Sequence, residues 1–238
     1  GEVFFRYTAT SLSALRQGID AAGGEEQRLV LKVGALPTVS ALILPDAVRM
    51  LTDDSPGLRT RIITGPNNYL LSMLRTGDVD LVIGRMARPD DMLGLSFEHL
   101  YFERVVMAVR PGHPLLSVDD FNAGMVEPYQ VLMPTPDSVI RRLVDQMLLA
   151  QGVTELRDEI ETVSNAFGRS YVRGTDAVWL ISHGVVARDV EEGQLALLPV
   201  DMSDTIGPVG FTTRTDQERA VATAGFMQAV REVAARLR

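Results

Sequence analysis

The chain has 238 residues, of which 46% are hydrophobic, and it carries a formal net charge of −8. It contains no cysteine, which excludes disulfides, thiolate metal sites and a cysteine nucleophile. The acidic charge argues against nucleic-acid binding by this segment itself, because phosphate contacts need a basic face. No apolar stretch approaches the length of about twenty residues that a membrane-spanning helix needs, so the sequence predicts no membrane span.

The first part of the chain alternates between strand and helix patterns. Short apolar runs predict strands of a parallel sheet, and apolar residues at helical spacing predict the helices between them. In chain order these elements are expected at 29–33, 42–52, 58–64, 70–77 and 81–83. Such a unit places both strand-to-helix corners at one edge of the sheet, where helix N-termini bind small anions.

A polar stretch at 86–94 interrupts the pattern, and a second α/β series follows. Its strands are expected at 104–110, 129–133, 159–163, 177–181 and 195–200, with helices at 118–125, 138–151, 165–173 and 185–192. After a second break, a strand is expected at 208–214 and a long amphipathic helix at 217–237.

Two α/β halves joined by two crossings predict a clamshell of two Rossmann-like lobes that holds a ligand between them. Lobe I is expected at 28–102 plus 208–238 and lobe II at 103–207, with hinges near 86–103 and 201–208. Residues 3–22 can form a helix with an apolar stripe, within a segment 1–27 that leads into the first strand. That helix either packs on a second copy of the chain or is a fraying end.

Several long segments resemble the LysR-type transcriptional regulators. The resemblance rests on YTATSLSALRQGIDAA, VGALPTVSALILP, ITGPNNYLLSMLRTGDVDLVIGR, FERVVMAVRPGHPLL and GPVGFTTRTD, and it covers essentially the whole chain. The segments VLMPTPDSVIRRLVDQ and IETVSNAFGR are most similar to the subgroup that controls protocatechuate (pca) operons. Residues 1–4 would then begin the linker helix that follows a winged helix-turn-helix absent from this chain.

The resemblance implies a cytoplasmic activator or repressor that assembles as a homodimer or homotetramer. It would bind promoter DNA through the missing N-terminal domain, act on RNA polymerase, and use its periplasmic-binding-protein-like clamshell for a small effector. The pca subgroup implies a carboxymuconate-type anion, and a sugar-responsive regulator of the same subgroup is the alternative. No cofactor and no metal are implied.

Candidate effector contacts follow from the ends of the predicted strands. In lobe I, Thr38 and Ser40 can cap the first helix or donate to a carboxylate. Asn67, between Pro66 and Asn68, offers both a capping oxygen and an amide donor. Arg85 is the best cationic candidate, because a strand-end guanidinium can bind a carboxylate through two hydrogen bonds. An ion pair with one of the nearby aspartates, Asp78, Asp80 or Asp90, is its structural alternative.

The second lobe offers a matching set. Thr135 and Ser138 form the corner before one helix, and Arg141, one turn further, either reaches the crevice or lies in solvent. Asn165 and Phe167 follow the next strand, with Phe167 a core residue in the ordinary case. His183 could respond to charge near neutral pH, or it is a loop residue bound by the backbone.

Known catalytic motifs are missing from the sequence. It has no P-loop, no Gly-x-Ser-x-Gly elbow and no pair of histidines at metal-ligand spacing, so we expect no enzyme. A solute-binding protein of a transporter is the remaining alternative. It shares the clamshell but has no need of an amphipathic leading helix.

Overall fold

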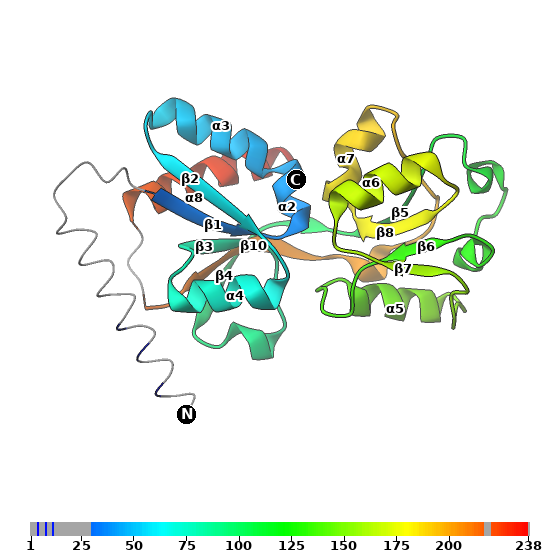
Figure 1. The fold of residues 1–238 in the computed structure, drawn as a ribbon, viewed down its shortest axis with the longest axis horizontal. Coiled ribbons are helices and arrows are strands. Elements are labelled where there is room, and N and C mark those ends of the chain that lie inside the picture. The colour runs from blue at the N-terminus through cyan, green and yellow to red at the C-terminus, as the bar shows by residue number, and fades with distance from the viewer. Residues whose placement is uncertain (1–3, 5–7, 9–10, 12–29, 217–219, 238) are drawn as a thin grey trace. The chain divides into compact units, whose positions relative to one another are not determined.

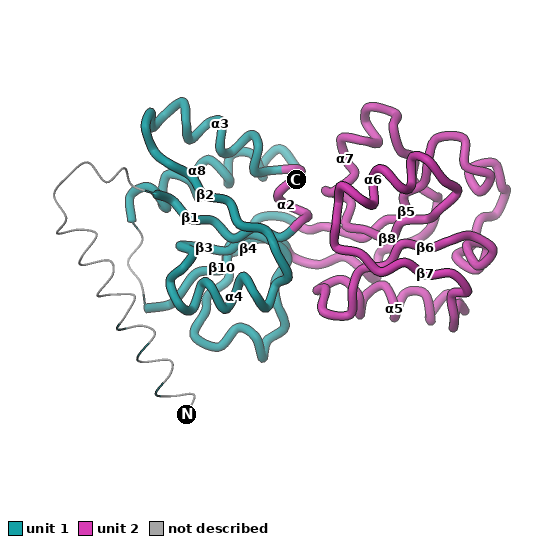
Figure 2. The backbone as a smooth tube through the Cα atoms, in the orientation of Figure 1, with its two compact units in different colours: residues 1–36, 43–101, 209–238 teal, residues 37–42, 102–208 magenta. Residues whose placement is uncertain are grey.

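The structure is a computed structural model that describes residues 4, 8, 11, 30–216 and 220–237. The chain forms two compact units, coloured separately in Figure 2. Unit 1 comprises residues 1–36, 43–101 and 209–238, and unit 2 comprises residues 37–42 and 102–208. The lobes expected from the sequence differ from these units chiefly in residues 37–42, which group with unit 2. Most of the predicted leader segment 1–27 lies outside the described residues.

Unit 1 is built on a five-stranded mixed sheet with the strand order β2-β1-β3-β10-β4. Its strands are β1 (Val30–Ala35), β2 (Arg59–Thr64), β3 (Leu81–Arg85), β4 (Leu95–Glu103) and β10 (Gly207–Arg214). β1 pairs in parallel with β2 and β3, whereas β10 runs antiparallel to β3. The carboxyl ends of β1, β2 and β3 therefore lie at one edge of this sheet.

Helices cover both faces of the unit 1 sheet (Figure 1). Helices α3 (Leu44–Asp54) and α8 (Val221–Ala234) pack together on one face, and α4 (Asn67–Thr76) lies on the other. The apolar side of α4 is buried against β3, with Leu70, Leu71 and Leu74 next to Val82 in one cluster. Helix α4 ends at Gly77, which has a φ of 77° and donates its N–H to the carbonyls of Met73 and Leu74.

Unit 2 repeats this plan with the strand order β7-β6-β8-β5-β9. Its strands are β5 (Val105–Val109), β6 (Val131–Met133), β7 (Glu159–Glu161), β8 (Val178–Ser182) and β9 (Ala196–Leu197). β6 is parallel to β7 and β8, and β5 is antiparallel to β8 and β9. Helix α5 (Arg141–Ala150) buries its apolar side on one face, and α6 (Asn165–Gly174) and α7 (His183–Glu191) bury theirs on the other.

A further short helix, α2 (Pro37–Leu42), packs on α7 within unit 2. Five single-turn 3₁₀ helices complete the described secondary structure: η1 (Pro89–Met92), η2 (Pro114–Ser117), η3 (Ala123–Val126), η4 (Ser203–Thr205) and η5 (Ala235–Leu237). The prediction of two Rossmann-like α/β lobes joined by crossover strands is confirmed. In the part of the chain that the structure describes, no helix is long and apolar enough to cross a bilayer.

Two predictions are wrong, and one predicted helix begins later than expected. Residues 95–103 form strand β4, although the sequence placed them in a hinge. The helix expected at 118–125 does not form: η2, capped by His113, ends before it at Ser117, and only η3 overlaps that stretch, where Asn122 accepts the Gly124 N–H to start the turn. Asp120 lies between them with a φ of 55°, which a continuous helix cannot accommodate. The helix expected from residue 138 begins only at Arg141.

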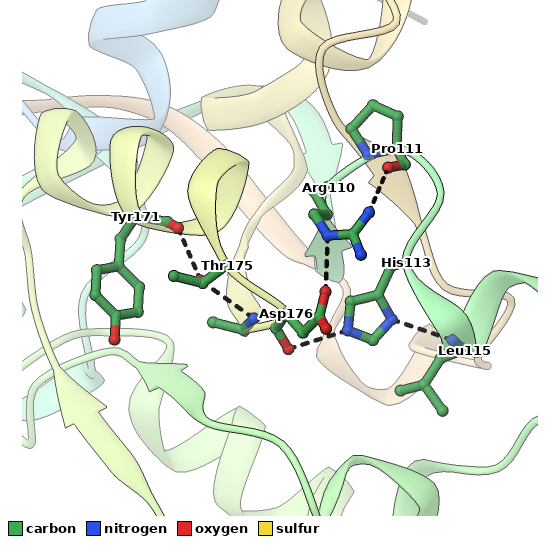
Figure 3. A network of polar contacts seen from close by, with 8 residues as sticks. Arg110, Pro111, His113, Leu115, Tyr171, Thr175 and Asp176 are labelled. Carbon is green, nitrogen blue, oxygen red and sulfur yellow. Dashed lines mark hydrogen bonds and ion pairs between the residues drawn. The ribbon is translucent and has the colours of Figure 1, made fainter.

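His113 joins the end of β5 to the start of β8 inside unit 2 (Figure 3). Its Nδ1 accepts the N–H of Leu115 at 3.1 Å, so Nε2 carries the proton and donates to the carbonyl of Asp176 at 3.0 Å. Arg110 binds the Asp176 carboxylate at 2.7 Å and the Pro111 carbonyl at 3.0 Å. These bonds hold the His113 ring in place, and its role is structural.

Candidate functional site

In unit 1, the edge formed by the carboxyl ends of β1, β2 and β3 carries two buried polar side chains. Asn67 is the first residue of α4 and is 8% exposed, and Arg85 is the last residue of β3 and is 5% exposed. Pro66 precedes Asn67 and provides no side-chain cap for α4. The neighbouring Asn68 is exposed, and its Oδ1 accepts the N–H of Tyr69 at 2.7 Å. Of the three residues at this corner, Asn67 is therefore the one held inside the edge.

Gly84, directly before Arg85, allows Leu36 to pack closely on β3. Leu36 crosses over β3 at this point, and its N–H donates to the carbonyl of Ile83 at 3.0 Å. A Cβ at residue 84 would lie 2.4 Å from Leu36 Cδ1, so only glycine allows this approach. Arg85 itself pairs with Val209 of β10 across the sheet.

In unit 2, the short helix α2 presents Thr38 and Ser40. Thr38 is 7% exposed, and α2 packs against α7. Ser40 Oγ donates to the carbonyl of Pro37 at 2.8 Å, so this hydroxyl is bonded within its own helix. Thr38 is thus buried in α2, whereas the Ser40 hydroxyl is already bonded to the backbone.

The carboxyl ends of β6, β7 and β8 lie at one edge of the unit 2 sheet, and the loop after β6 carries Thr135 and Ser138. Thr135 Oγ1 donates to Asp137 Oδ1 at 2.6 Å, and the Ser138 N–H donates to the Thr135 carbonyl at 2.9 Å. The turn is therefore closed by its own residues. Thr135 and Ser138 are both half-buried at its surface.

Arg141 binds protein carboxylates at the start of α5. Its guanidinium lies 2.9 Å from Asp145, 3.2 Å from Glu159 and 2.5 Å from Glu161, and it donates to the Pro134 carbonyl at 3.0 Å. Burial opposes the charged form, but the hydrogen bonds to Asp145 and Glu161 outweigh it and raise the pKa of Arg141. The sequence predicted that Arg141 either reaches the crevice or lies in solvent. Neither describes this side chain, because it is bound by protein carboxylates.

The start of α6 holds Asn165 and Phe167. Ser164 caps this helix by accepting the N–H of Phe167 at 3.3 Å. Asn165 is half-buried, and Phe167 is 41% exposed and stacks on Tyr171 with ring centroids 5.3 Å apart. Phe167 is therefore a surface side chain at this edge and not a core residue.

His183 begins α7 and lies half-buried after β8. Its N–H donates to the carbonyl of Arg104 at 3.0 Å. Burial, assisted by the positive charge of Arg104, lowers the pKa of His183, and Glu191 opposes that shift. The imidazole is therefore biased toward its neutral form.

Sequence reasoning missed Glu103, the last residue of β4. This carboxylate is 6% exposed, and its Oε1 accepts the N–H of Gly184 at 2.6 Å in the first turn of α7. A glycine directly after a strand-end histidine was the available signal, because a missing side chain often marks a close approach. Among the described residues, no three histidine, aspartate or glutamate side chains gather as a metal site.

Comparison with known proteins identifies the family of this chain. A model of the LysR substrate binding domain matches residues 24–235. The HTH-type transcriptional regulator PcaQ of Agrobacterium fabrum (strain C58) is 49% identical over 239 residues, which cover 100% of this chain and 77% of that protein.

Solved structures share the fold at low sequence identity. A full-length mutant of BenM superposes with a TM-score of 0.71 at 18% identity, covering 100% of this chain and 78% of that one. The CcmR regulatory domain of Synechocystis PCC6803, in complex with 2-PG, gives 0.71 at 15% identity, covering 86% and 97%. The chain therefore belongs to the LysR substrate-binding domain family and is the effector-binding domain of a LysR-type transcriptional regulator.

Proposed function

We propose that this domain senses a small carboxylated intermediate of aromatic catabolism, of the carboxymuconate type, and thereby controls a pca-type operon. The observation that carries the proposal is the 49% identity to PcaQ along the entire chain. In this role the full protein works in the cytoplasm as a homodimer or homotetramer. It binds promoter DNA through a domain that precedes this segment, and it acts on RNA polymerase.

The buried polar groups at the sheet edges suit an anionic effector. Arg85 supplies a guanidinium that can bind a carboxylate through two hydrogen bonds, and Asn67 supplies an amide at the start of α4. A helix N-terminus favours negative charge by about 0.3–1 kcal/mol when exposed, and more when partly buried. These two residues are the proposed effector contacts of unit 1.

The proposed contacts in unit 2 are Thr38, Ser138, Asn165, Phe167 and His183. This set omits Ser40, Thr135 and Arg141, and the unit 1 set omits Asn68, because each of these side chains is bonded within the protein. Pro66 shapes the α4 corner without a polar side chain. A neutral His183 can donate one hydrogen bond without adding charge to the site.

Calorimetric titration tests the proposal directly. The panel comprises carboxymuconate, its lactone, protocatechuate, muconate and neutral sugars. We expect saturable binding of the carboxylated compounds, and Arg85→Gln should weaken it about tenfold or more, because a hydrogen bond to a charged group is lost. Arg142→Gln is the control, because it makes the same substitution at an exposed arginine.

A second pair of variants separates a ligand contact from a structural hydroxyl. Thr38→Val removes a buried hydroxyl at nearly constant volume and should weaken binding, whereas Ser40→Ala should leave it unchanged. Thermal unfolding of each variant shows whether the domain remains folded. Binding of a sugar without any response to the carboxylated compounds would contradict the pca assignment and favour a sugar-responsive regulator.

A further inference from the structure

The first turn of α7 already binds a carboxylate, and that carboxylate belongs to the protein. Glu103 reaches this turn from the end of β4, and its Oε1 accepts the Gly184 N–H at 2.6 Å. The side chain is 6% exposed, so the bond lies away from solvent. Helix N-termini stabilise anions through their free N–H groups and the helix dipole. Glu103 therefore occupies the place that an effector carboxylate would take at this helix.

Gly184 makes room for this arrangement. A Cβ at residue 184 would lie 2.5 Å from Glu103 Oε1, 3.1 Å from Leu42 Cδ2 and 3.4 Å from the Thr38 carbonyl. The Glu103 carboxylate and α2 therefore both border the space that a side chain at residue 184 would need. Because Thr38 belongs to α2, the position of a proposed effector contact depends on what fills the start of α7.

The first turns of α5 and α6, which begin at this edge of unit 2, are capped differently from that of α7. The first turns of α5, α6 and α7 contain no acidic residue of their own. Helix α6 is capped by the neutral hydroxyl of Ser164, and α5 has no side-chain cap. A protein carboxylate thus accepts an N–H in the first turn of α7, whereas the carboxylates at the start of α5 bind Arg141 and α6 is capped by a hydroxyl.

We propose that Glu103 is a positioning and specificity-determining residue for the effector site. Its carboxylate fills the anion position at the start of α7, excludes an effector carboxylate from that helix, and seats α2 so that Thr38 is correctly placed. This inference rests on the proposed function in one respect, which is that the effector is a carboxylate. The occupation of the helix start by Glu103 can be tested without any effector.

The experiment compares Glu103→Ala and Glu103→Gln with the unmodified domain. Glu192→Gln is the matched control, because it removes the same charge at the exposed opposite end of α7. Thermal unfolding is measured in sodium formate and in sodium chloride at equal ionic strength. Formate is small enough to replace the missing carboxylate, so we expect it to raise the Tm of Glu103→Ala above the value in chloride. The unmodified domain and Glu192→Gln should show no such difference.

Effector titration then tests the specificity role. Glu103→Ala should bind the carboxylated compounds about tenfold more weakly. Added formate should restore the affinity, because α2 then returns to its position. A merely structural residue would not give this rescue. Glu103→Gln retains an acceptor oxygen, so its affinity should fall between those of Glu103→Ala and the unmodified domain. If Glu103→Ala does not fold, an unchanged affinity in Glu103→Gln overturns the proposal.

The two proposals fail in different ways. No difference between formate and chloride for folded Glu103→Ala would overturn the role of Glu103 even if the domain binds carboxymuconate. Conversely, an unmodified domain that ignores every carboxylated compound would overturn the proposed function, while a formate response in Glu103→Ala would still support an anion position at α7.

Discussion

Lys32 and Asp80 are joined by reciprocal hydrogen bonds across β1 and β3. The Lys32 N–H donates to Asp80 Oδ2 at 2.7 Å, and the Asp80 N–H donates to the Lys32 carbonyl at 2.8 Å. Burial raises the pKa of Asp80 above its usual 3.8, although the Lys32 N–H and the charges of Lys32 and Arg214 oppose the shift. The only lysine in the sequence thus takes part in fixing the sheet through its main chain.

Asp80→Asn should therefore become more favourable as the pH rises. Because the folded pKa of Asp80 is raised, its contribution to stability is fully present below the unfolded pKa and is lost as the pH rises through the folded pKa. Asparagine keeps an acceptor for Lys32 and has no proton to lose. Urea unfolding of both proteins from about pH 3.5 to about pH 7 measures the difference. Asp80→Ala is the control, and the unpaired Lys32 N–H should cost about 1–3 kcal/mol. A pH-independent difference for Asp80→Asn would contradict this account.

Gly210 and Gly225 should respond to alanine in opposite ways. A Cβ at Gly210 in β10 would lie 2.0 Å from the Glu98 carbonyl oxygen, so alanine there must push β4 and β10 apart. We expect Gly210→Ala to lower the free energy of unfolding by about 3 kcal/mol. Gly225 lies inside α8 with its nearest neighbour, Leu51 Cδ1, at 3.8 Å, so Gly225→Ala should stabilise by about 0.5–1 kcal/mol. Circular dichroism during urea unfolding measures both. Equal effects of the two variants would disprove the close approach at Gly210.

Asp189 should be costly to remove. Its buried carboxylate binds Arg169 Nε at 2.8 Å and also binds Arg173, both from α6. Asp189→Ala leaves Arg169 partly buried without this carboxylate, and we expect a loss of about 3 kcal/mol in the free energy of unfolding. Arg173→Gln should cost less than about 1 kcal/mol, because the Arg173 side chain is 40% exposed and solvent screens its charge. A larger loss for Arg173→Gln than for Asp189→Ala would contradict the view that this group of ion pairs depends on Asp189.

His183 should make the domain less stable in mild acid. Because its pKa is lowered in the folded state, the unfolded chain takes up the proton first as the pH falls through about 6.5. Stability therefore decreases with acidification until the pH is below the folded pKa. His183→Asn should remove this part of the slope, and Arg104→Gln should reduce it because the Arg104 charge helps to lower the pKa. Unfolding free energies between about pH 8 and pH 5 test both variants. A slope unchanged in His183→Asn would assign the acid sensitivity to other groups.

Much of the fold follows from local sequence patterns. The strands β1 and β3 were predicted from apolar runs, β2 from its β-branched residues, and α4 from its apolar spacing and the glycine at its end. Strand β4 was missed because its sequence, LSFEHLYFE, alternates only in part and follows a polar stretch. Its pairing in the sheet depends on β10, more than a hundred residues further along the chain.

The candidate site was less predictable because its contacts are distant in sequence. Asn67 was found because a helix start after a strand is a local pattern. The role of Arg141 depends on the parallel register that places Met133 opposite Glu161, and no local pattern reveals that register. Glu103 and Gly184 are 81 positions apart, and their contact exists only once β4 has reached α7.

The division of the chain also has a consequence for its synthesis. All five strands of unit 2 come from residues 105–197, so its sheet can form while the remaining chain is still on the ribosome. The sheet of unit 1 needs β10 between β3 and β4, and α3 needs α8. A nascent chain therefore displays the open edge of β3 until β10 has been synthesised, more than a hundred residues later. Truncations that remove residues 207–238 should yield aggregates, because the edge of β3 then has no β10 to cover it.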